Sequence, residues 1–569
     1  GNTGPDGTNF GSGGNGGNTG LYYLGSNITV AGAAAVTGGA GGNGGNTTNG
    51  VSGNGGGGGG GGSGLTSAGV AATITNNGTI TGGVGGTGGS GGFSGGGGAG
   101  GDGLLSLGGS ASIVNTGTIT GGAGGAAGAG ASGSAAGGAG GTGVDLAQTH
   151  NSLANIGTIS GGMGIGGGVG VVTRGMDSIT NAGLIMGALT GAGGTRAAAI
   201  KFGGTDNSLN LLTGSSILGT LLFDAGATAT IAASNTGLTL NNDVILSDAA
   251  SRATVSTAST GLTMSGVISG AGSLSVVGGN TLTISGINTY TGATTISNGT
   301  LALAGSGSIA ASSGVVLNSV LDISAVTSGT SIKALSGAGT VRLGAQSLSL
   351  TNAAGTFDGV IDGTGGVRVA AGTQTLTGTS TYTGATVVDS GATLKLSGGG
   401  SVAASSGVTS NGALDISATT NGASLTGIAG SGSVALGART LTLTNASGVF
   451  SGSIGGSGGL TLNGGTQTLS AANVYTGATT INGGTLALTG AGQLSSVTSL
   501  AMLGSGATFD MSAAGTQAVS GLSGVAGTRL LMGANSLSVD ASGNSTYAGD
   551  LAGSGTFTKL GSGMLVLNG

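Results

Sequence analysis

Two short phrases recur in the C-terminal half of the chain with one long period. The phrase Tyr-Thr-Gly-Ala begins at Tyr290, Tyr382 and Tyr475, at intervals of 92 and 93 residues. The phrase Met/aromatic-x-Gly-x-Ile/Leu-x-Gly begins at Met264, Phe357, Phe450 and Tyr547, at intervals of 93, 93 and 97 residues. Because two independent phrases keep one register, this half is a repeat array, and repeat arrays bury their core between neighbouring copies.

Apolar and hydroxyl residues alternate strictly inside each period. Examples are TLTIS at Thr281–Ser285, LTLTN at Leu441–Asn445 and TLALT at Thr485–Thr489. A period of two residues is typical of a strand with one buried face, and Gly and Asn between such segments mark turns. Helix is disfavoured because all 16 acidic residues are Asp, so Glu, a good helix former, is missing.

Three architectures build a protein from short strands: a sandwich, a propeller and a solenoid. A sandwich does not repeat its own sequence, and propeller blades carry aromatic signatures, whereas aromatic residues are 2% of this chain. The sequence therefore predicts an all-β parallel β-helix, or β-solenoid. If a coil takes roughly 20–25 residues, each period holds about four coils, stacked about 4.8 Å apart.

The N-terminal part repeats a different phrase, with an asparagine at the same place in each copy. The copies are TITNNGTITGG, SIVNTGTITGG, SLANIGTISGG and SITNAGLIMG, and the asparagines are Asn76, Asn115, Asn155 and Asn181. Amides stacked coil on coil form a ladder. We expect these asparagines to have a structural role and not a ligand-binding one.

Glycine-rich inserts, such as Gly53–Gly64 and Gly121–Gly143, separate these phrases. One interpretation is a set of flexible linkers. The other is a set of ordered glycine helices packed beside the solenoid, since only glycine lets backbones approach so closely. The sequence leaves both open.

Charge and cysteine usage exclude several classes of function. The net charge is -5 and the 11 Lys and Arg residues are scattered, which argues against nucleic-acid binding and against a polybasic membrane anchor. The chain has no Cys, so it has neither disulfides nor thiolate metal sites. In a large exported chain, this absence fits passage across the periplasm in an unfolded state.

Catalytic constellations are not recognisable. His150 is the only histidine and Asp145 lies five residues before it, but no nucleophile motif accompanies them. Asp358 and Asp362 would share one face of an unbroken strand, as a glycosidase pair requires, but Gly359 intervenes. We expect a non-catalytic protein without a metal ion or cofactor.

Three weaker patterns suggest binding. The segment GGTDNSLN (Gly203–Asn210) faintly resembles a calcium-binding nonapeptide, which functions in tandem copies, and Arg174–Asp177 only approximates an Arg-Gly-Asp tripeptide. Paired threonines in an exposed array would order water, as in an ice-binding solenoid. These pairs are Thr73/Thr75, Thr118/Thr120, Thr281/Thr283 and Thr442/Thr444. We prefer the structural interpretation of each pattern, since Thr favours strands.

Two segments resemble the autotransporter-associated β-strand repeat of passenger domains. They are Asn280–Gly305, with its Asn-x-Tyr-x-Gly and Gly-Thr-Leu-x-Leu signatures, and Thr558–Gly569, with Lys-x-Gly-x-Gly-x-Leu-x-Leu-x-Gly. The resemblance covers roughly residues 260–569. It implies a right-handed β-helix exported through a C-terminal outer-membrane barrel. Such passengers serve mostly in adhesion, autoaggregation and biofilm, with proteases and toxins a minority.

The chain departs from that family in lacking the long alternating strands of the barrel. It also stops inside a repeat, so we expect either residues beyond Gly569 or a last coil open to stacking.

The sequence thus predicts three parts: a glycine-rich solenoid over 1–200, connecting coils over 201–260, and a solenoid with 93-residue repeats over 261–569. The expected role is an extracellular rod on a Gram-negative surface that contacts host, abiotic or neighbouring-cell surfaces. The alternative is a filament subunit that stacks end to end as a homo-oligomer. No nucleic acid is expected as a partner, and any membrane tether would be a barrel outside this chain.

Overall fold

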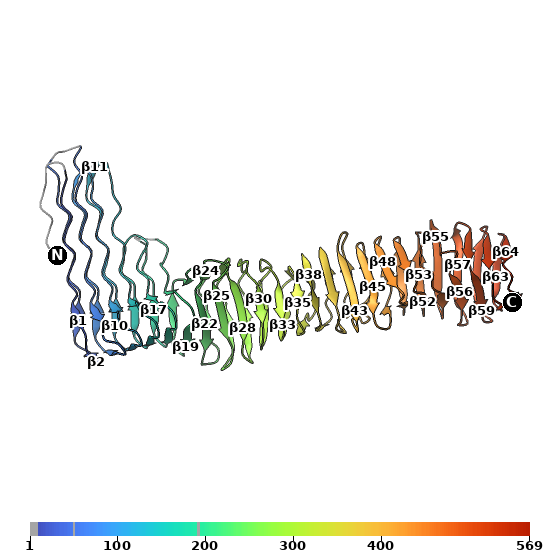
Figure 1. Cartoon of the computed structure of the whole chain (residues 1–569), viewed down its shortest axis with the longest axis horizontal. Helices are drawn as coiled ribbons and strands as arrows, with labels where there is room; N and C mark the ends of the chain where they lie inside the picture. Colours follow the sequence, from blue (N-terminus) through green and yellow to red (C-terminus); the bar gives the residue numbers. More distant parts are fainter. Residues whose placement is uncertain (1–9, 49–51, 191–193) are drawn as a thin grey trace. The chain divides into compact units, whose positions relative to one another are not determined.

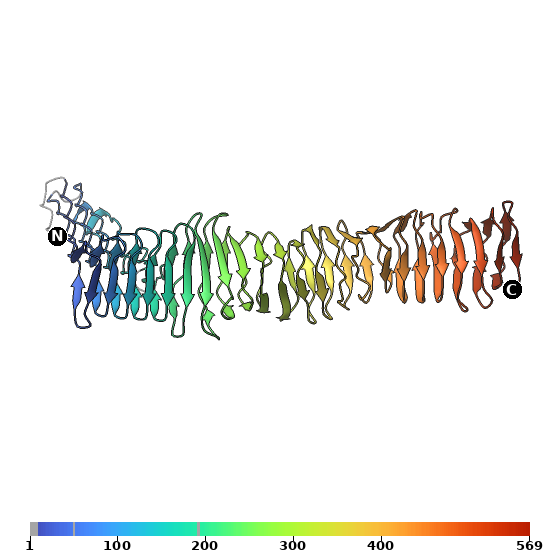
Figure 2. The same ribbon diagram turned by 60° about the horizontal axis from the view of Figure 1, so that its bottom comes forward.

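The computed structural model describes residues 10–48, 52–190 and 194–569, which form short parallel strands joined by turns and contain no helix. Strand pairing throughout is parallel and joins strands of successive coils, so the chain is a β-solenoid, as predicted (Figures 1 and 2). The only antiparallel contact in the described part is an isolated bridge between Leu189 and Arg196. No helix in these residues is long and apolar enough to cross a membrane.

Contacts divide the chain into two units, Gly1–Leu301 and Ala302–Gly569. The three parts predicted above are defined by repeat type, so this division does not test them.

Alternation decides which side chains enter the core. In β22 (Thr228–Ala233), Ala229, Ile231 and Ala233 are buried, while the alternate residues, Thr228, Thr230 and Ala232, are half-buried on the outer face. Inward residues of one coil are in register with inward residues of the next. Phe202, for example, pairs with Phe223, and their ring centroids are 4.8 Å apart. The narrow core is thus a continuous spine of inward Leu, Ile, Val and Ala.

The first unit has three faces. The first sheet contains β1 (Leu21–Tyr23), β4 (Leu65–Ser67), β8 (Leu104–Ser106), β12 (Val144–Leu146), β15 (Val171–Val172), β18 (Ile200–Phe202), β21 (Leu221–Phe223), β24 (Val244–Leu246) and β27 (Ile268–Gly270). Within this unit the second contains β2 (Asn27–Val30), β5 (Thr73–Asn76), β9 (Ser112–Asn115), β13 (Ser152–Asn155), β16 (Ser178–Asn181), β19 (Asn207–Leu211), β22, β25 (Arg252–Ser256), β28 (Ser273–Val277) and β30 (Thr294–Ile296).

The third face is made of two separate sheets. The first contains β3 (Ala35–Thr37), β6 (Thr79–Thr81), β10 (Thr118–Thr120), β14 (Thr158–Ser160), β17 (Leu184–Met186) and β20 (Ser216–Leu218). The second begins with β23 (Thr239–Leu240), β26 (Leu262–Met264) and β29 (Thr281–Ile284). Two short strands in the glycine-rich inserts, β7 (Gly91–Phe93) and β11 (Gly130–Gly133), pair with each other. The strand β31 (Thr300–Gly305) contains the division between the units.

In the second unit the faces are assembled from shorter sheets. Two pairings come first: β32 (Val315–Leu317) with β35 (Leu335–Ser336), and β33 (Val320–Val326) with β36 (Thr340–Arg342) and β39 (Val360–Asp362). One sheet contains β34 (Thr330–Ile332), β37 (Leu348–Leu350), β40 (Val367–Val369), β42 (Thr386–Val388), β44 (Val408–Ser410) and β47 (Ile428–Ala429). Another contains β38 (Ala353–Phe357), β41 (Gly372–Leu376), β43 (Thr393–Gly398), β45 (Ala413–Thr419), β48 (Ser433–Gly437) and β51 (Ser453–Gly456).

Three further sheets complete this unit. The first contains β46 (Ala423–Leu425), β49 (Leu441–Leu443), β52 (Leu460–Leu462), β54 (Thr479–Ile481), β56 (Ser499–Met502), β59 (Gly521–Gly524), β62 (Ser545–Tyr547) and β65 (Leu565–Leu567). The second contains β50 (Ala446–Phe450), β53 (Gly465–Leu469), β55 (Thr485–Gly490), β57 (Thr508–Ala514), β60 (Arg529–Gly533) and β63 (Asp550–Gly553). The third contains β58 (Gln517–Val519), β61 (Leu537–Asp540) and β64 (Phe557–Leu560).

The 93-residue period does not contain a whole number of coils. Thr386 stacks on Val408, which stacks on Ile428, and the parallel bridge from Gly430 to Phe450 continues this column toward Gln467 in β53. The repeat equivalent of Thr386 is Thr479, which lies twelve residues beyond Gln467 on a different sheet. Each period therefore exceeds the four expected coils by more than half a coil, and the repeated phrase moves to another face.

Candidate functional surfaces

The glycine-rich inserts form an ordered bundle. Segments 38–46, 82–90 and 121–129 lead away from the third face and are called the outgoing layer here. Segments 11–20, 55–64, 95–103 and 136–143 lead into the first sheet and are called the returning layer. Figure 1 shows the inserts extending side by side away from the strands, with β11 near their far end.

Backbone hydrogen bonds connect the bundle within and between its layers. In the returning layer, the Gly58 N–H donates to the Gly96 carbonyl at 2.8 Å, and in the outgoing layer the Gly41 N–H donates to the Val84 carbonyl at 2.8 Å. Between the layers, the Gly86 N–H donates to the Gly59 carbonyl at 2.8 Å. The second interpretation of the inserts, as ordered glycine helices, is therefore confirmed.

Hydrogen bonding in the bundle has a period of three residues. The N–H groups of Gly55, Gly58 and Gly61 all donate to one neighbouring segment, and those of Gly56 and Gly59 donate to another. No described glycine before Gly166 has a φ in the left-handed region. A three-residue period without internal hydrogen bonds is that of the extended polyproline II helix.

In the helix 55–64, which has neighbours on two sides, two of every three residues must be glycine. A Cβ on Gly59 would lie 2.0 Å from the Asn15 carbonyl oxygen, and one on Gly58 would lie 2.0 Å from that of Gly86. A Cβ on Gly60 would meet nothing closer than 3.7 Å. The glycine content of the inserts is thus explained by backbone packing on two sides of each helix.

The predicted asparagine ladder is present inside the first unit. Asn76 Nδ2 donates to Asn115 Oδ1 at 2.7 Å, Asn115 donates to Asn155 at 2.8 Å, and Asn155 donates to Asn181 at 2.8 Å. Asn181 donates to Ser215 Oγ at 2.7 Å, where the ladder ends. All four asparagines are buried, and the first three also donate to the carbonyls of Thr118, Thr158 and Leu184, which begin β10, β14 and β17.

In the repeats, each Tyr-Thr-Gly-Ala tyrosine is buried and bonded to the threonine four residues later. The hydroxyl of Tyr382 lies 2.6 Å from Thr386 Oγ1, and that of Tyr475 lies 2.6 Å from Thr479 Oγ1. Burial raises the pKa of Tyr382 to about 12, and the hydrogen bond with Thr386 opposes that shift. Burial likewise raises the pKa of Tyr475. These tyrosines are therefore neutral structural groups at physiological pH.

Sequence reasoning missed a second set of buried polar groups, the glutamines. Gln467 Nε2 donates to the carbonyls of Ile428 and Gly448, at 2.9 and 3.1 Å, and so spans two successive coils. Gln374 makes the same contacts with Leu335 and Gly355. They stabilise the junctions where one sheet ends and the next begins. The signal was available, because the phrase Gly-Thr-Gln-Thr-Leu recurs with the long period at Gly372 and Gly465.

A few charged residues lie near the base of the glycine bundle. Asp145 on β12 forms an ion pair with Arg174 at 3.1 Å, and Asp102 accepts a hydrogen bond from the Thr142 N–H at 3.0 Å. Burial raises the pKa of both carboxyls, and these partners oppose the shift. No group of three or more metal-binding side chains occurs in the described residues.

His150 and Asp145 do not form a hydrogen-bonded pair. His150 lies in an exposed turn with a φ of 66°, and its Nδ1 lies 2.9 Å from the hydroxyl of the adjacent Thr149. Asp145 is engaged with Arg174 instead. This arrangement supplies no base for a serine nucleophile.

Asp358 and Asp362 do not share a strand. β38 ends at Phe357, and β39 begins after the corner at Asp358 and Gly359. Asp358 accepts a hydrogen bond from the hydroxyl of Thr377, while Asp362 is in register with Arg342. The condition for a carboxylate pair on one face, an unbroken strand, is therefore not met.

The two weak binding motifs form turns closed by their own side chains. Asn207 Nδ2 donates to the carbonyls of Gly203 and Thr228, at 3.0 and 3.1 Å, and so takes oxygens that a cation would use. Asp177 is buried and accepts hydrogen bonds from the N–H groups of Arg174 and Asn151, both at 2.8 Å.

The four threonine pairs do not form one array. β5, β10, β29 and β49, on or beside which they lie, belong to four different sheets. The pair Thr118/Thr120 is in register with Thr79/Thr81 and Thr158/Ser160 of neighbouring coils, and not with the other three predicted pairs. A flat array of the predicted pairs is therefore not formed.

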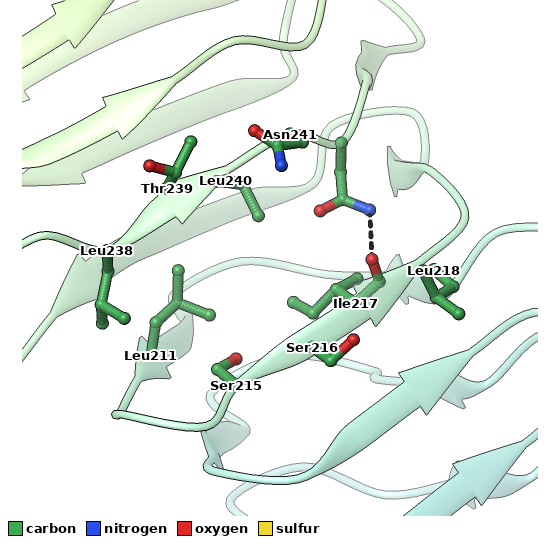
Figure 3. Close-up of a pocket in the computed structure, with 10 residues that line it drawn as sticks. Leu211, Ser215, Ser216, Ile217, Leu218, Leu238, Thr239, Leu240 and Asn241 are labelled. Carbon is green, nitrogen blue, oxygen red and sulfur yellow. Dashed lines mark hydrogen bonds between the residues drawn. The ribbon is translucent and has the colours of Figure 1, made fainter.

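A hollow of about 220 Å³ lies where the third face of the first unit is interrupted. β20 pairs with β17, and β23 pairs with β26, but β20 and β23 belong to different sheets. Figure 3 shows Leu211, Leu238 and Leu240 together with Ser, Thr and Asn side chains around the hollow. Asn242 Nδ2 donates to the carbonyls of Ile217 and Gly219, at 2.9 and 2.7 Å, across the interruption. The lining residues contain no charged side chain, so the hollow offers contacts without an acid or a base.

The fold and these sites define a class of protein, a repeat-built parallel β-solenoid whose polar core groups are structural. Residues 274–303, 371–396 and 462–488 match the passenger-associated-transport-repeat family, and each segment contains one buried tyrosine of the Tyr-Thr-Gly-Ala phrase. Comparisons with curated proteins and with solved structures gave no match. The repeats, together with the solenoid that carries them, support an autotransporter passenger domain. This family implies export to the cell surface or the extracellular space, and the repeat solenoid favours a structural role over a catalytic one.

Proposed function

We propose that the chain is a non-catalytic rod on the surface of a Gram-negative bacterium that mediates adhesion, autoaggregation or biofilm formation. The observation that carries this proposal is the set of passenger repeats on a parallel β-solenoid. A passenger of this kind meets its surroundings through the outward residues of its sheets.

Those outward residues support contact with surfaces and not chemistry on a substrate. In one sheet of the second unit, Ser424, Thr442, Thr461 and Thr480 stack in register as a column of hydroxyls. Ion pairs such as Arg368 with Asp389 and Lys395 with Asp415 are isolated and partly exposed. A neutral, hydroxyl-rich lateral face suits many weak hydrogen bonds to glycans, abiotic surfaces or neighbouring cells.

The test is to display the chain on a non-aggregating Gram-negative host through a heterologous membrane anchor. We expect faster settling of the cells and greater retention on hydrophilic surfaces than with the anchor alone. Soluble chain added in excess should compete with both effects. Settling and retention equal to those of the anchor-only cells would overturn the proposal.

The alternative role, a filament subunit that stacks end to end, predicts a different result with purified protein. Electron microscopy would then show lengths that increase with concentration. Particles of one length at every concentration would count against the filament and leave the surface role in place.

A further inference from the structure

The two faces of the glycine bundle differ at the positions whose Cβ points outward. These outer positions come every third residue. In the outgoing layer all of them carry side chains, and they are Ala40, Asn43, Asn46, Val84, Thr87, Ser90, Ala123, Ala126 and Ala129. In the returning layer five of them are glycine, namely Gly13, Gly16, Gly57, Gly60 and Gly96.

The fold itself does not require these five glycines. A Cβ on Gly13, Gly16 or Gly60 would lie 3.7 Å from its nearest neighbour, which is ordinary van der Waals contact. Their φ angles are not left-handed either. Glycine at such a position costs conformational entropy, and a close approach by another backbone is a recognised reason for it.

The returning layer also presents unpaired backbone groups. Within the described residues, the N–H groups of Gly57 and Gly60 and the carbonyl of Gly58 have no hydrogen-bond partner in the chain. The buried side of the same helix is fully engaged, since Gly59 donates to Gly42 and accepts from Gly86. The outer side of the returning layer therefore offers N–H donors and carbonyl acceptors like those of its inner side. On the inner side, these groups are bonded to the outgoing layer.

On the other sides of the bundle, side chains cover part of the backbone. On the outgoing layer, Asn43 Oδ1 accepts a hydrogen bond from the Thr87 N–H at 2.9 Å, and Asn46 Oδ1 accepts one from Ser90 at 2.7 Å. The first helix carries Ser12, Asn15 and Asn18 at positions where the next helix has contact glycines. At the opposite edge, the Ile165 side chain covers Gly137.

We propose that the returning layer is a contact surface for the returning layer of a second copy of the chain. The contact would resemble the packing of the two layers inside one chain. There, glycine backbones lie against each other and are joined by N–H···O=C bonds. Donors and acceptors occur on the same face, so the face is self-complementary, as a two-fold contact requires. Asp102 is the only charged residue of the four returning segments, and no Lys or Arg precedes Arg174, so charge repulsion is small.

The size of the face fits a weak dimer. Nine residues of an extended helix span about 28 Å, and four neighbours spaced as stacked coils span about 19 Å. Two such faces bury roughly 1,000 Å² in total, near the lower limit for a specific interface. This contact between copies does not depend on whether the passenger mediates adhesion.

Sedimentation velocity of the purified full chain over a wide concentration range tests the proposal. Wild type should form a dimer reversibly, and Gly57→Gln/Gly60→Gln should raise its Kd at least tenfold because both side chains lie between the faces. The matched control on the outgoing layer, Val84→Gln/Thr87→Gln, should leave Kd unchanged. A wild type that stays monomeric, or equal Kd values for the two variants, would overturn the contact.

Engineered cysteines give a second measurement that does not depend on the folding of the glutamine variants. The chain has no Cys of its own, so each added thiol is the only one in the molecule. Gly60→Cys should be joined between copies by a short bis-maleimide, whereas Thr87→Cys should not. A Cβ at Gly60 is accommodated, so this variant keeps the bundle. Equal cross-linking at both positions, or none at Gly60, would contradict the proposal even if the glutamine variants fold poorly.

Discussion

At the scale of single residues, the first unit depends on amides that satisfy one another inside the core. Asn115 receives a hydrogen bond from Asn76 and donates one to Asn155, and it is fully buried. A buried polar group costs free energy unless it is paired, so each member of the ladder requires its neighbours. The ladder fixes register, because a slip by one residue would leave every amide in the series without a partner.

Asn115→Ala should destabilise the first unit by about 2–4 kcal/mol, because it leaves groups of Asn76 and Asn155 buried and unpaired. Chemical denaturation followed by circular dichroism measures this change. Asn77→Ala is the control, since Asn77 is exposed in the adjacent turn and should cost less than about 1 kcal/mol. Equal effects of the two substitutions would show that the ladder does not stabilise the fold.

The buried tyrosines predict loss of stability in alkali. The folded pKa of Tyr382 is about 12, above the usual value of about 10 for an unfolded chain. Its contribution to stability is therefore fully present below pH 10 and is lost as the pH rises through about 12. Tyrosinate absorbance and the strand signal should change together in this range, and Tyr382→Phe/Tyr475→Phe should move the midpoint upward. Ionisation of all tyrosines near pH 10 with the fold intact would contradict the buried placement.

At the scale of elements, the glycine bundle shows how backbone packing replaces side-chain packing. Its helices bury Gly56, Gly59 and Gly62 where a solenoid strand would bury Leu or Ile. The bundle therefore has little apolar surface to bury, and its cohesion comes from backbone hydrogen bonds repeated in every three residues. Such an element is sensitive to one added methyl group at a contact position and insensitive at an outer position.

Gly59→Ala and Gly60→Ala are a matched pair for this claim. A Cβ on Gly59 would lie 2.0 Å from the Asn15 oxygen, so Gly59→Ala should separate the helices and increase amide hydrogen exchange across the bundle by tenfold or more. Gly60→Ala, whose Cβ is in open contact, should leave exchange unchanged or slow it. Similar exchange in both variants would show that the helices are not packed in this way.

Strands and the amide ladder were predictable because each rests on a local pattern. Alternation at Thr281–Ser285 places Leu282 and Ile284 inward whatever the neighbours are, and Asn76 and Asn115 hold one place in a repeated phrase. The role of Gln467 was missed although its phrase recurs with the long period, because its partners Ile428 and Gly448 lie outside that phrase. Likewise, the spacing of Asp358 and Asp362 alone does not show whether the two carboxylates share one face. The strand break between β38 and β39 separates them.

At the scale of the molecule, the repeat and the coil are separate periods. Because the 93-residue period exceeds four coils by more than half a coil, equivalent phrases appear on different faces, as the positions of β42 and β54 in separate sheets illustrate. The sequence could give the length of the repeat but not this offset, which depends on the residues each coil uses. A consequence is that each face of the second unit displays different parts of the repeat.

The central claim is that coils stack in parallel register about 20 residues apart, and engineered disulfides test it most directly. Thr461 and Thr480 are partners on β52 and β54, and adjacent strands hold Cα atoms within the range that a disulfide spans. In the naturally cysteine-free chain, Thr461→Cys/Thr480→Cys should oxidise within one molecule, whereas Thr461→Cys/Thr485→Cys, with the second position on another sheet, should not. Disulfide formation by the second pair and not by the first would contradict the solenoid.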